Sequence, residues 1–323
     1  MRESRGRSSE TSFRLCSRAP RMMSWSATVV LCLVLDNERD GVEHMFVSMA
    51  RRGQADAPDH PMTPYRQRAH RPPGGVVARS GTMGPVTHDA GLAPHLADLL
   101  AEADQALVRT VDGLPDDAYA EPSLLPDWTR AHVVAHLTLN AEGLAGVLHG
   151  AHLGHPRTMY SSLEARNGDI AELATTDPAD LRERFLTSVG VLGEALGAMV
   201  DDDWDGRFER VPGAGTDISV AQVPLMRLRE AEIHHADLGA DYTAADWPEA
   251  FRVILLESMT KRPYPAPFEA RPTDLDRTWH YGEGGGGPVV TGTSAAIGWW
   301  LTGRGSGEGV SSDTGSLPEV ESW

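Results

Sequence analysis

Apolar residues recur at steps of three and four over much of residues 92–238, a spacing that helices bury on one face. The rhythm begins at Leu92 and continues through Leu107, until Gly113 and Pro115 interrupt it. This predicts a first helix of about five turns. Similar spacing predicts further helices over about 129–150, 161–173, 178–200 and 221–238.

Turn and cap residues separate these segments: Leu125-Pro-Asp-Trp-Thr129 precedes the second helix, and Gly239 closes the last. Because the connections are short, we expect a four-helix bundle over residues 88–240. After Tyr242 the helical rhythm weakens. The fold class predicted is mainly α, a four-helix bundle followed by a small α+β domain over residues 241–323, with short strands and a terminal helix at about 278–281, 288–291 and 294–302.

Residues 1–87 are chemically different from the rest of the chain. They hold thirteen arginines against eight acidic residues, as well as both cysteines, Cys16 and Cys32. Rich in Pro, Gly and Arg, this segment is expected to be disordered or a spurious extension, with Met83 as an alternative start. Its apolar run at 27–35 is shorter than the ~20 residues of a membrane span and is followed by no cleavage pattern. We therefore expect a cytoplasmic protein.

The formal net charge of −17 disfavours nucleic acid and anionic membranes as partners and favours a small molecule. Since residues 88–323 contain no cysteine, that part of the chain has no disulfide and no thiol nucleophile of its own.

The last helix of the bundle carries a pair of candidate metal ligands. At 100° per residue, Glu230 and His234 fall within about 40° of each other, on the half of the helix that also bears its apolar residues. A rival pair, Glu232 and His235, falls on the opposite side with Arg229 and is expected to be solvated.

His136 is the third candidate ligand. It shares a face of the second helix with Val133, Leu137, Asn140, Gly143 and Val147, whereas Thr138, Glu142 and His149 point away. One carboxylate and two imidazoles can bind one divalent ion and leave a coordination position open. The alternative is an ordinary half-buried His136, with Glu230 paired to Arg227 one turn back.

Two arginines are candidates for binding an anionic group beside such a metal. Arg166 either binds a carboxylate or is an ordinary surface residue. Arg304 follows a glycine at the end of the terminal helix, where it either presents its fork to a carboxylate or complements the helix dipole.

Over residues 90–323 the chain resembles the mycothiol-dependent maleylpyruvate isomerase family of DinB-like metal-binding bundles. The resemblance rests on these strings: Leu125-Pro-Asp-Trp-Thr-Arg-Ala-His-Val-Val-Ala-His136 with Asn140-Ala141, Met159-Tyr160 with Arg166, Arg229-Glu-Ala-Glu-Ile-His-His-Ala-Asp-Leu238, and Trp300-Leu-Thr-Gly-Arg304.

The resemblance implies a divalent metal, usually zinc, on His136, Glu230 and His234, and a catalytic role for Arg304. It also implies mycothiol as the borrowed thiol, ionised at the metal. The reaction implied is the cis-trans isomerisation of maleylpyruvate to fumarylpyruvate in aromatic catabolism, in which the thiol adds, the new single bond rotates and the thiol leaves. Arginines such as Arg304 would hold the substrate carboxylates.

Two other functions are compatible with the sequence. A mycothiol S-transferase of the same fold would need the same metal and thiol but would release the adduct. A non-catalytic metal- or ligand-binding regulator would have no open coordination position and no need for a thiol.

Overall fold

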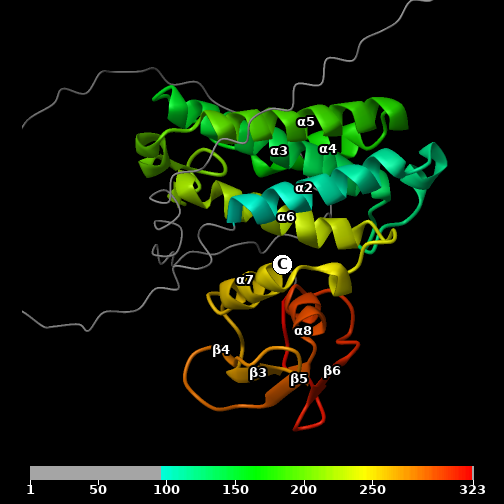
Figure 1. The fold of residues 1–323 in the computed structure, drawn as a ribbon, viewed down its shortest axis with the longest axis vertical. Coiled ribbons are helices and arrows are strands. Elements are labelled where there is room, and N and C mark those ends of the chain that lie inside the picture. Colours follow the sequence, from blue (N-terminus) through cyan, green and yellow to red (C-terminus); the bar gives the residue numbers. More distant parts are fainter. Residues whose placement is uncertain (1–95, 322–323) are drawn as a thin grey trace, which may run out of the picture.

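The structure is a computed structural model that describes residues 96–321. The expectations for residues 1–87, including the alternative start at Met83, lie outside the described residues. Within them the chain forms a bundle of long helices and a smaller domain of two helices and a sheet (Figure 1). The predicted fold class, mainly α with a small α+β part at the C-terminal end, is confirmed.

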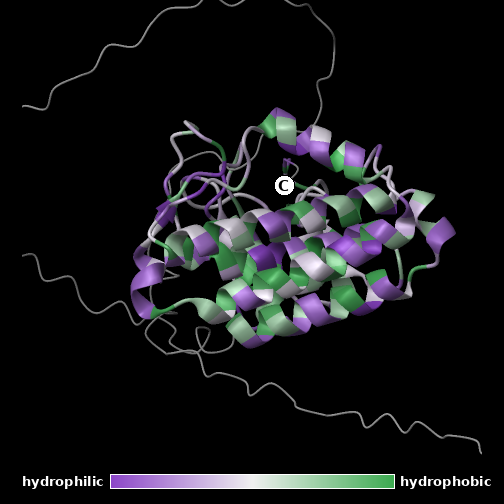
Figure 2. Cartoon of the chain, turned by 90° about the horizontal axis from the view of Figure 1, so that it is seen from above, coloured by the Kyte–Doolittle hydropathy of each residue, from purple (hydrophilic) through white to green (hydrophobic). Residues whose placement is uncertain are grey.

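Four long helices and one shorter helix make the bundle. The elements up to residue 237 are α2 (Leu96–Gly113), η3 (Asp116–Ala120), α3 (Arg130–His152), α4 (Leu163–Leu173), α5 (Pro178–Ala198), η4 (Asp201–Asp205), β1 (Arg207–Phe208), β2 (Ile218–Ser219), η5 (Val220–Gln222) and α6 (Val223–Asp237). All five predicted helices are present, with ends shifted by a few residues. In Figure 2 the helices lie side by side and carry both hydrophobic and hydrophilic residues along their length.

Local chemistry explains where these helices begin. Thr129 caps α3 in a reciprocal arrangement with His132, whose Nδ1 lies 2.8 Å from the Thr129 hydroxyl. The Ser162 hydroxyl accepts from the backbone N–H of Ala165 at the start of α4. Pro178 occupies the first turn of α5, where its missing N–H costs nothing. These residues define where α3, α4 and α5 begin.

The C-terminal domain packs two helices against one sheet. Its elements are η6 (Ala244–Asp246), α7 (Glu249–Met259), β3 (Phe268–Pro272), β4 (Trp279–Tyr281), β5 (Val289–Gly292), α8 (Ser294–Leu301) and β6 (Val310–Ser312). The strand order is β4-β3-β5-β6. Strands β3 and β5 are parallel, with Ala270 opposite Val290, and the other pairs are antiparallel.

The expectation of a weak helical rhythm after Tyr242 is wrong for α7. Phe251, Leu255, Leu256 and Met259 are all fully buried on one side of that helix. Strands β3 and β6 were also not predicted, because segments of three to five residues carry too little alternation to be recognised and are defined by their partners in the sheet. The expected strands at about 278–281 and 288–291 and the terminal helix are confirmed as β4, β5 and α8.

Helix α6 is enclosed on all sides. It lies between the other bundle helices and the C-terminal domain (Figure 1), and every residue from Glu230 to Leu238 is buried. The Trp247 indole N–H, just before α7, donates to the carbonyl of Glu232 at 3.0 Å. One face of α6 can therefore contact the other bundle helices while the opposite face contacts the C-terminal domain. Among residues 96–321, no helix is long and apolar enough to cross a membrane.

Candidate metal centre

The structure brings together the three residues predicted to bind a metal, which we call the metal triad: His136, Glu230 and His234. His136 comes from α3, and the other two lie one turn apart on α6. The Glu230 Oε2 atom lies 2.9 Å from Nε2 of His136 and 3.3 Å from Nε2 of His234. The two imidazole rings cross at 85°. The exposed fractions of the three residues are only 3% for His136, 9% for Glu230 and 7% for His234.

The donor set fits one divalent ion. One ligand atom from each residue lies within 4.8 Å of the others. In a tetrahedral site with bonds of about 2.1 Å, neighbouring ligand atoms lie roughly 3.4 Å apart, so small side-chain adjustments suffice. Three protein ligands leave a fourth position for another molecule, which is the arrangement of catalytic rather than structural zinc sites.

Burial and the close charges set the protonation of the triad. Burial lowers the pKa of His136 to about 4, which leaves the neutral imidazole that a metal requires. Burial opposes ionisation of Glu230, but the two imidazoles outweigh it and hold the pKa of its carboxyl well below its ordinary value. Burial also opposes the charge on His234, yet Asp237 and Glu230 outweigh it and raise the pKa of this residue. A proton therefore competes with the metal chiefly at His234.

The alternative partner for Glu230 is not used. Arg227 pairs instead with Asp104 on α2, at 2.9 Å, and donates to the carbonyl of Leu137 and to Oδ1 of Asn140. His136 is likewise too buried to be an ordinary half-exposed histidine.

The prediction that Glu232 and His235 are solvated is wrong, because each is only 2% exposed. The Tyr242 hydroxyl donates to Oε2 of Glu232 at 2.5 Å, and its ring stacks on His235 at 3.7 Å between centroids. The His235 Nε2 lies 2.7 Å from the Thr110 hydroxyl of α2. Burial raises the pKa of Glu232 to about 7 and lowers that of His235 to about 4. The helical wheel assigned these side chains to the correct face of α6. It could not show that the C-terminal domain covers the face that carries Glu232 and His235.

Thr138 was also expected to point away from the core, and this is wrong. It is fully buried, and its hydroxyl donates to the carbonyl of Val134 within the same helix. A threonine can satisfy its hydroxyl on its own helix, so its polarity is weak evidence for exposure.

Arg166 lies beside the metal triad. Its Nη2 is 3.1 Å from Nδ1 of His136, and its guanidinium lies over the Tyr160 ring, 5.6 Å from the centroid. Nη1 donates to Asn167, and the buried Nε has no hydrogen-bond partner among the described residues. Within residues 96–321 no ion pair to a carboxylate is formed by Arg166. Arg166 is thus half-buried against His136 and Tyr160, and its binding of a substrate carboxylate stays a prediction.

The segment that carries Tyr160 approaches α3 over a glycine. A Cβ at Gly143 would lie 3.1 Å from the carbonyl of Met159 and 3.6 Å from the Tyr160 ring. The Tyr160 backbone N–H donates to the carbonyl of Arg210 at 2.9 Å. The buried Tyr160 hydroxyl has no hydrogen-bond partner among the described residues. Tyr160 belongs to one of the sequence strings that carry the family resemblance, but the spacing of residues gave no reason to expect its side chain at this site.

Arg304 reaches the site from the end of α8. Its Nε and Nη2 donate to the two carboxylate oxygens of Asp237 at 3.3 and 2.9 Å, and its Nη1 donates to the carbonyl of Thr302. Asp237 Oδ2 in turn lies 2.9 Å from Nδ1 of His234. The carboxylate that the Arg304 guanidinium binds is thus that of Asp237, a residue of the same chain. Sequence reasoning missed Asp237, although its position three residues after His234 places both on one side of the helix.

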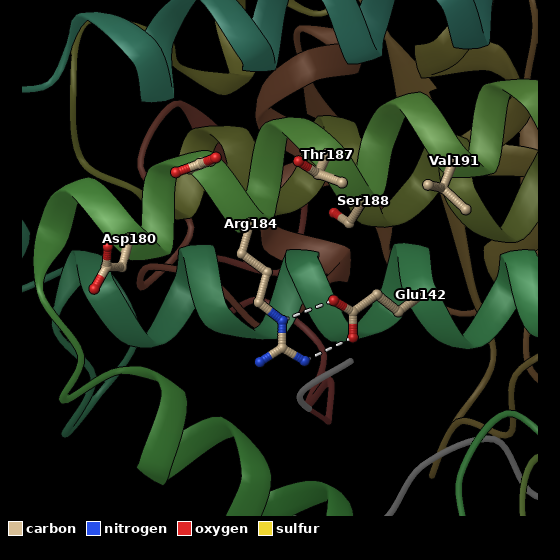
Figure 3. A pocket seen from close by; sticks show the side chains of 7 residues that line it. Glu142, Asp180, Arg184, Thr187, Ser188 and Val191 are labelled. Atoms are coloured by element: carbon tan, nitrogen blue, oxygen red, sulfur yellow. Dashed lines mark hydrogen bonds and ion pairs between the residues drawn. The ribbon is translucent and has the colours of Figure 1, made fainter.

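A surface hollow between α3 and α5 lies apart from this site. It is lined by acidic residues and by Arg184, which binds both carboxylate oxygens of Glu142 at 2.8 and 2.9 Å (Figure 3). None of the metal triad lines it.

The chain is similar in sequence and fold to known proteins. Residues 100–239 match the family model described as the mycothiol maleylpyruvate isomerase N-terminal domain. A crystal structure of the mycothiol-dependent maleylpyruvate isomerase is 30% identical, with a TM-score of 0.64, and the match covers 72% of this chain and 97% of that one. The chain belongs to the mycothiol-dependent maleylpyruvate isomerase family.

Further comparisons give similar values. A variant of the same isomerase gives a TM-score of 0.65 at the same identity and coverage. Two uncharacterized proteins from two strains of Mycobacterium tuberculosis are each 29% identical over 228 residues, which is 65% of this chain and 85% of theirs. The matched family region spans α2 to α6 and therefore includes the whole metal triad.

Proposed function

We propose that this chain is a metal-assisted, mycothiol-dependent isomerase that converts maleylpyruvate, or a similar small electrophile, from the cis to the trans form. One observation supports this most strongly. Three protein ligands would leave a coordination position of a divalent ion open, and the buried metal triad lies beside Arg166, a cation with no carboxylate partner among the described residues.

The three ligands suit a divalent ion such as zinc. A metal held by these residues would supply a site that ionises a bound thiol, and the thiolate would be the nucleophile for reversible addition to the double bond. His136 contributes a neutral imidazole, and Glu230 contributes the negative charge that offsets the ion. Residues 88–323 contain no cysteine, so the sulfur must come from a separate molecule.

Arg166 and Tyr160 are the groups we assign to the substrate. A guanidinium without a carboxylate partner binds an anion strongly, because charge-assisted hydrogen bonds are about twice as strong as neutral ones. The Tyr160 hydroxyl beside it can donate a further hydrogen bond to a substrate oxygen. The positive charge of Arg166 offsets, at the site, the negative net charge of the chain, which by itself would repel a dianion. Arg304 is a second arginine that we expect the reaction to require.

The test is to incubate purified protein with mycothiol and maleylpyruvate and to follow the absorbance of substrate and product. Activity should require both the thiol and the metal. His136→Ala should be inactive, and His235→Ala, a histidine outside the metal triad, should remain active. Turnover without any added thiol would refute the proposal. Accumulation of a stable thioether, detected by mass spectrometry, would instead identify an S-transferase.

A further inference from the structure

Asp237 is a fully enclosed charged residue beside the metal triad. Its exposed fraction is 0%, and both of its carboxylate oxygens are used. Oδ2 lies 2.9 Å from Nδ1 of His234, and Arg304 donates to both oxygens from the other side. Three side chains therefore form a line from the C-terminal domain to a metal ligand, in the order Arg304, Asp237, His234.

The two ring nitrogens of His234 face different partners. Nε2 faces Glu230 and the centre of the triad, whereas Nδ1 faces Asp237. A carboxylate at Nδ1 keeps the proton on that nitrogen, so that the lone pair of Nε2 is available to a metal and the ring keeps one orientation. The carboxylate also makes the imidazole a more basic ligand.

Arg304 fixes the position of this carboxylate. The backbone hydrogen bond from Arg304 N–H to the Trp299 carbonyl and the contact of Nη1 with the Thr302 carbonyl hold the arginine at the end of α8. Gly303, with a φ of 74°, makes the turn that brings it there. The guanidinium offers two parallel N–H groups, which a lysine ammonium cannot reproduce.

We propose that Asp237 is a positioning residue for the metal ligand His234, and that Arg304 holds Asp237 in place, so that the C-terminal domain sets the affinity of the bundle for its metal. This inference rests on the metal site of the proposed function, but not on the thiol reaction. It assigns to Arg304 an effect through Asp237 and His234 rather than a direct contact with substrate.

A second Arg–Asp pair, which joins α6 to α2, provides a control. Arg227 of α6 pairs with Asp104 at 2.9 Å and touches no atom of His234 in any hydrogen bond or ion pair of the described residues. Asp104→Asn and Asp237→Asn remove the same charge from the same kind of pair. If Asp237 only stabilised the fold, the two variants would behave alike.

The experiment measures Zn²⁺ affinity by competition with a chromogenic chelator, on the full-length protein stripped of metal. Asp237→Asn should bind Zn²⁺ about 10- to 100-fold more weakly than wild type, the usual effect of losing such a partner. Arg304→Lys should weaken binding by less, and Asp104→Asn should leave the affinity unchanged even where it lowers Tm. Histidine ¹⁵N labelling gives a second readout, in which the hydrogen-bonded proton on His234 Nδ1 should be visible in the zinc-loaded wild type and lost in Asp237→Asn.

Several results would overturn the inference. Equal Zn²⁺ affinity in Asp237→Asn and wild type would remove Asp237 from the metal site. If Asp237→Asn fails to fold, unchanged affinity in Arg304→Lys would exclude the part assigned to the C-terminal domain. Zn²⁺ bound equally by His136→Ala and wild type would refute the metal site itself, and with it the proposed function.

Discussion

Replacing Glu232 by glutamine is expected to make the protein progressively more stable, relative to wild type, as the pH rises from 5 to 8. Burial raises the pKa of this carboxyl from an ordinary 4.5 to about 7, although the Tyr242 hydroxyl donates to it. Between these two pH values the folded chain retains a proton that the unfolded chain has lost. The free energy of unfolding therefore falls as the pH rises through this window.

The size of the effect follows from that displacement. At 1.36 kcal/mol per pH unit, moving the pKa from 4.5 to about 7 costs about 3 kcal/mol once the group is ionised in both states. Glutamine has no such cost, and its carbonyl oxygen can still accept from Tyr242. Any amide N–H left unpaired costs about 1 to 3 kcal/mol, but equally at every pH.

Urea unfolding at pH 5, 6, 7 and 8, with metal removed from both proteins, measures this directly. The free energy of unfolding of Glu232→Gln relative to wild type should rise by about 2 to 3 kcal/mol from pH 5 to pH 8. Tyr242→Phe is the matched variant, because it removes the hydrogen bond that favours the ionised form and should deepen the loss above pH 7. A difference between Glu232→Gln and wild type that does not vary with pH would refute the reasoning.

Other predictions concern the site. Alanine at any residue of the metal triad should abolish stoichiometric metal in elemental analysis, whereas His235→Ala should retain it. Arg166→Ala should keep the metal but lower turnover by ~10² to 10³, or ~2.7 to 4 kcal/mol, with partial rescue by lysine; full activity would exclude its contact with substrate. Because the pKa of His234 is raised, Zn²⁺ affinity should fall by up to about tenfold per pH unit below that pKa, and a flat titration would contradict this. Gly143→Val should displace the Tyr160 segment and lower turnover at unchanged metal content, as measured by steady-state kinetics.

Much of the bundle and the inward direction of the three candidate metal ligands could be predicted from the sequence, because helical spacing, the face of α3 that carries His136 and the i, i+4 relation of Glu230 to His234 are local properties. The prediction that the opposite face of α6 is exposed was wrong, because the burial of that face depends on side chains outside the helix. The wheel gives the direction of Glu232 and His235 but not the presence of Tyr242 and Trp247 over them.

The role of Arg304 illustrates the same limit. Its place after Gly303 indicated a guanidinium presented to a carboxylate, and the structure has that contact. The identity of the carboxylate depends on how the C-terminal domain docks on α6, which no pattern within either segment specifies. Asp237 could be recognised only once that docking was known.

The enclosure of α6 also bears on how the protein is made. A chain is synthesised from its N-terminal end, and domains generally fold as they emerge. The ligands His136, Glu230 and His234 all precede Arg304, so a partly synthesised chain holds all three before the arginine that orients Asp237 exists. Such an intermediate has the triad but leaves the outer face of α6 open to water. Firm metal retention is therefore expected only after α8 and Arg304 have been translated.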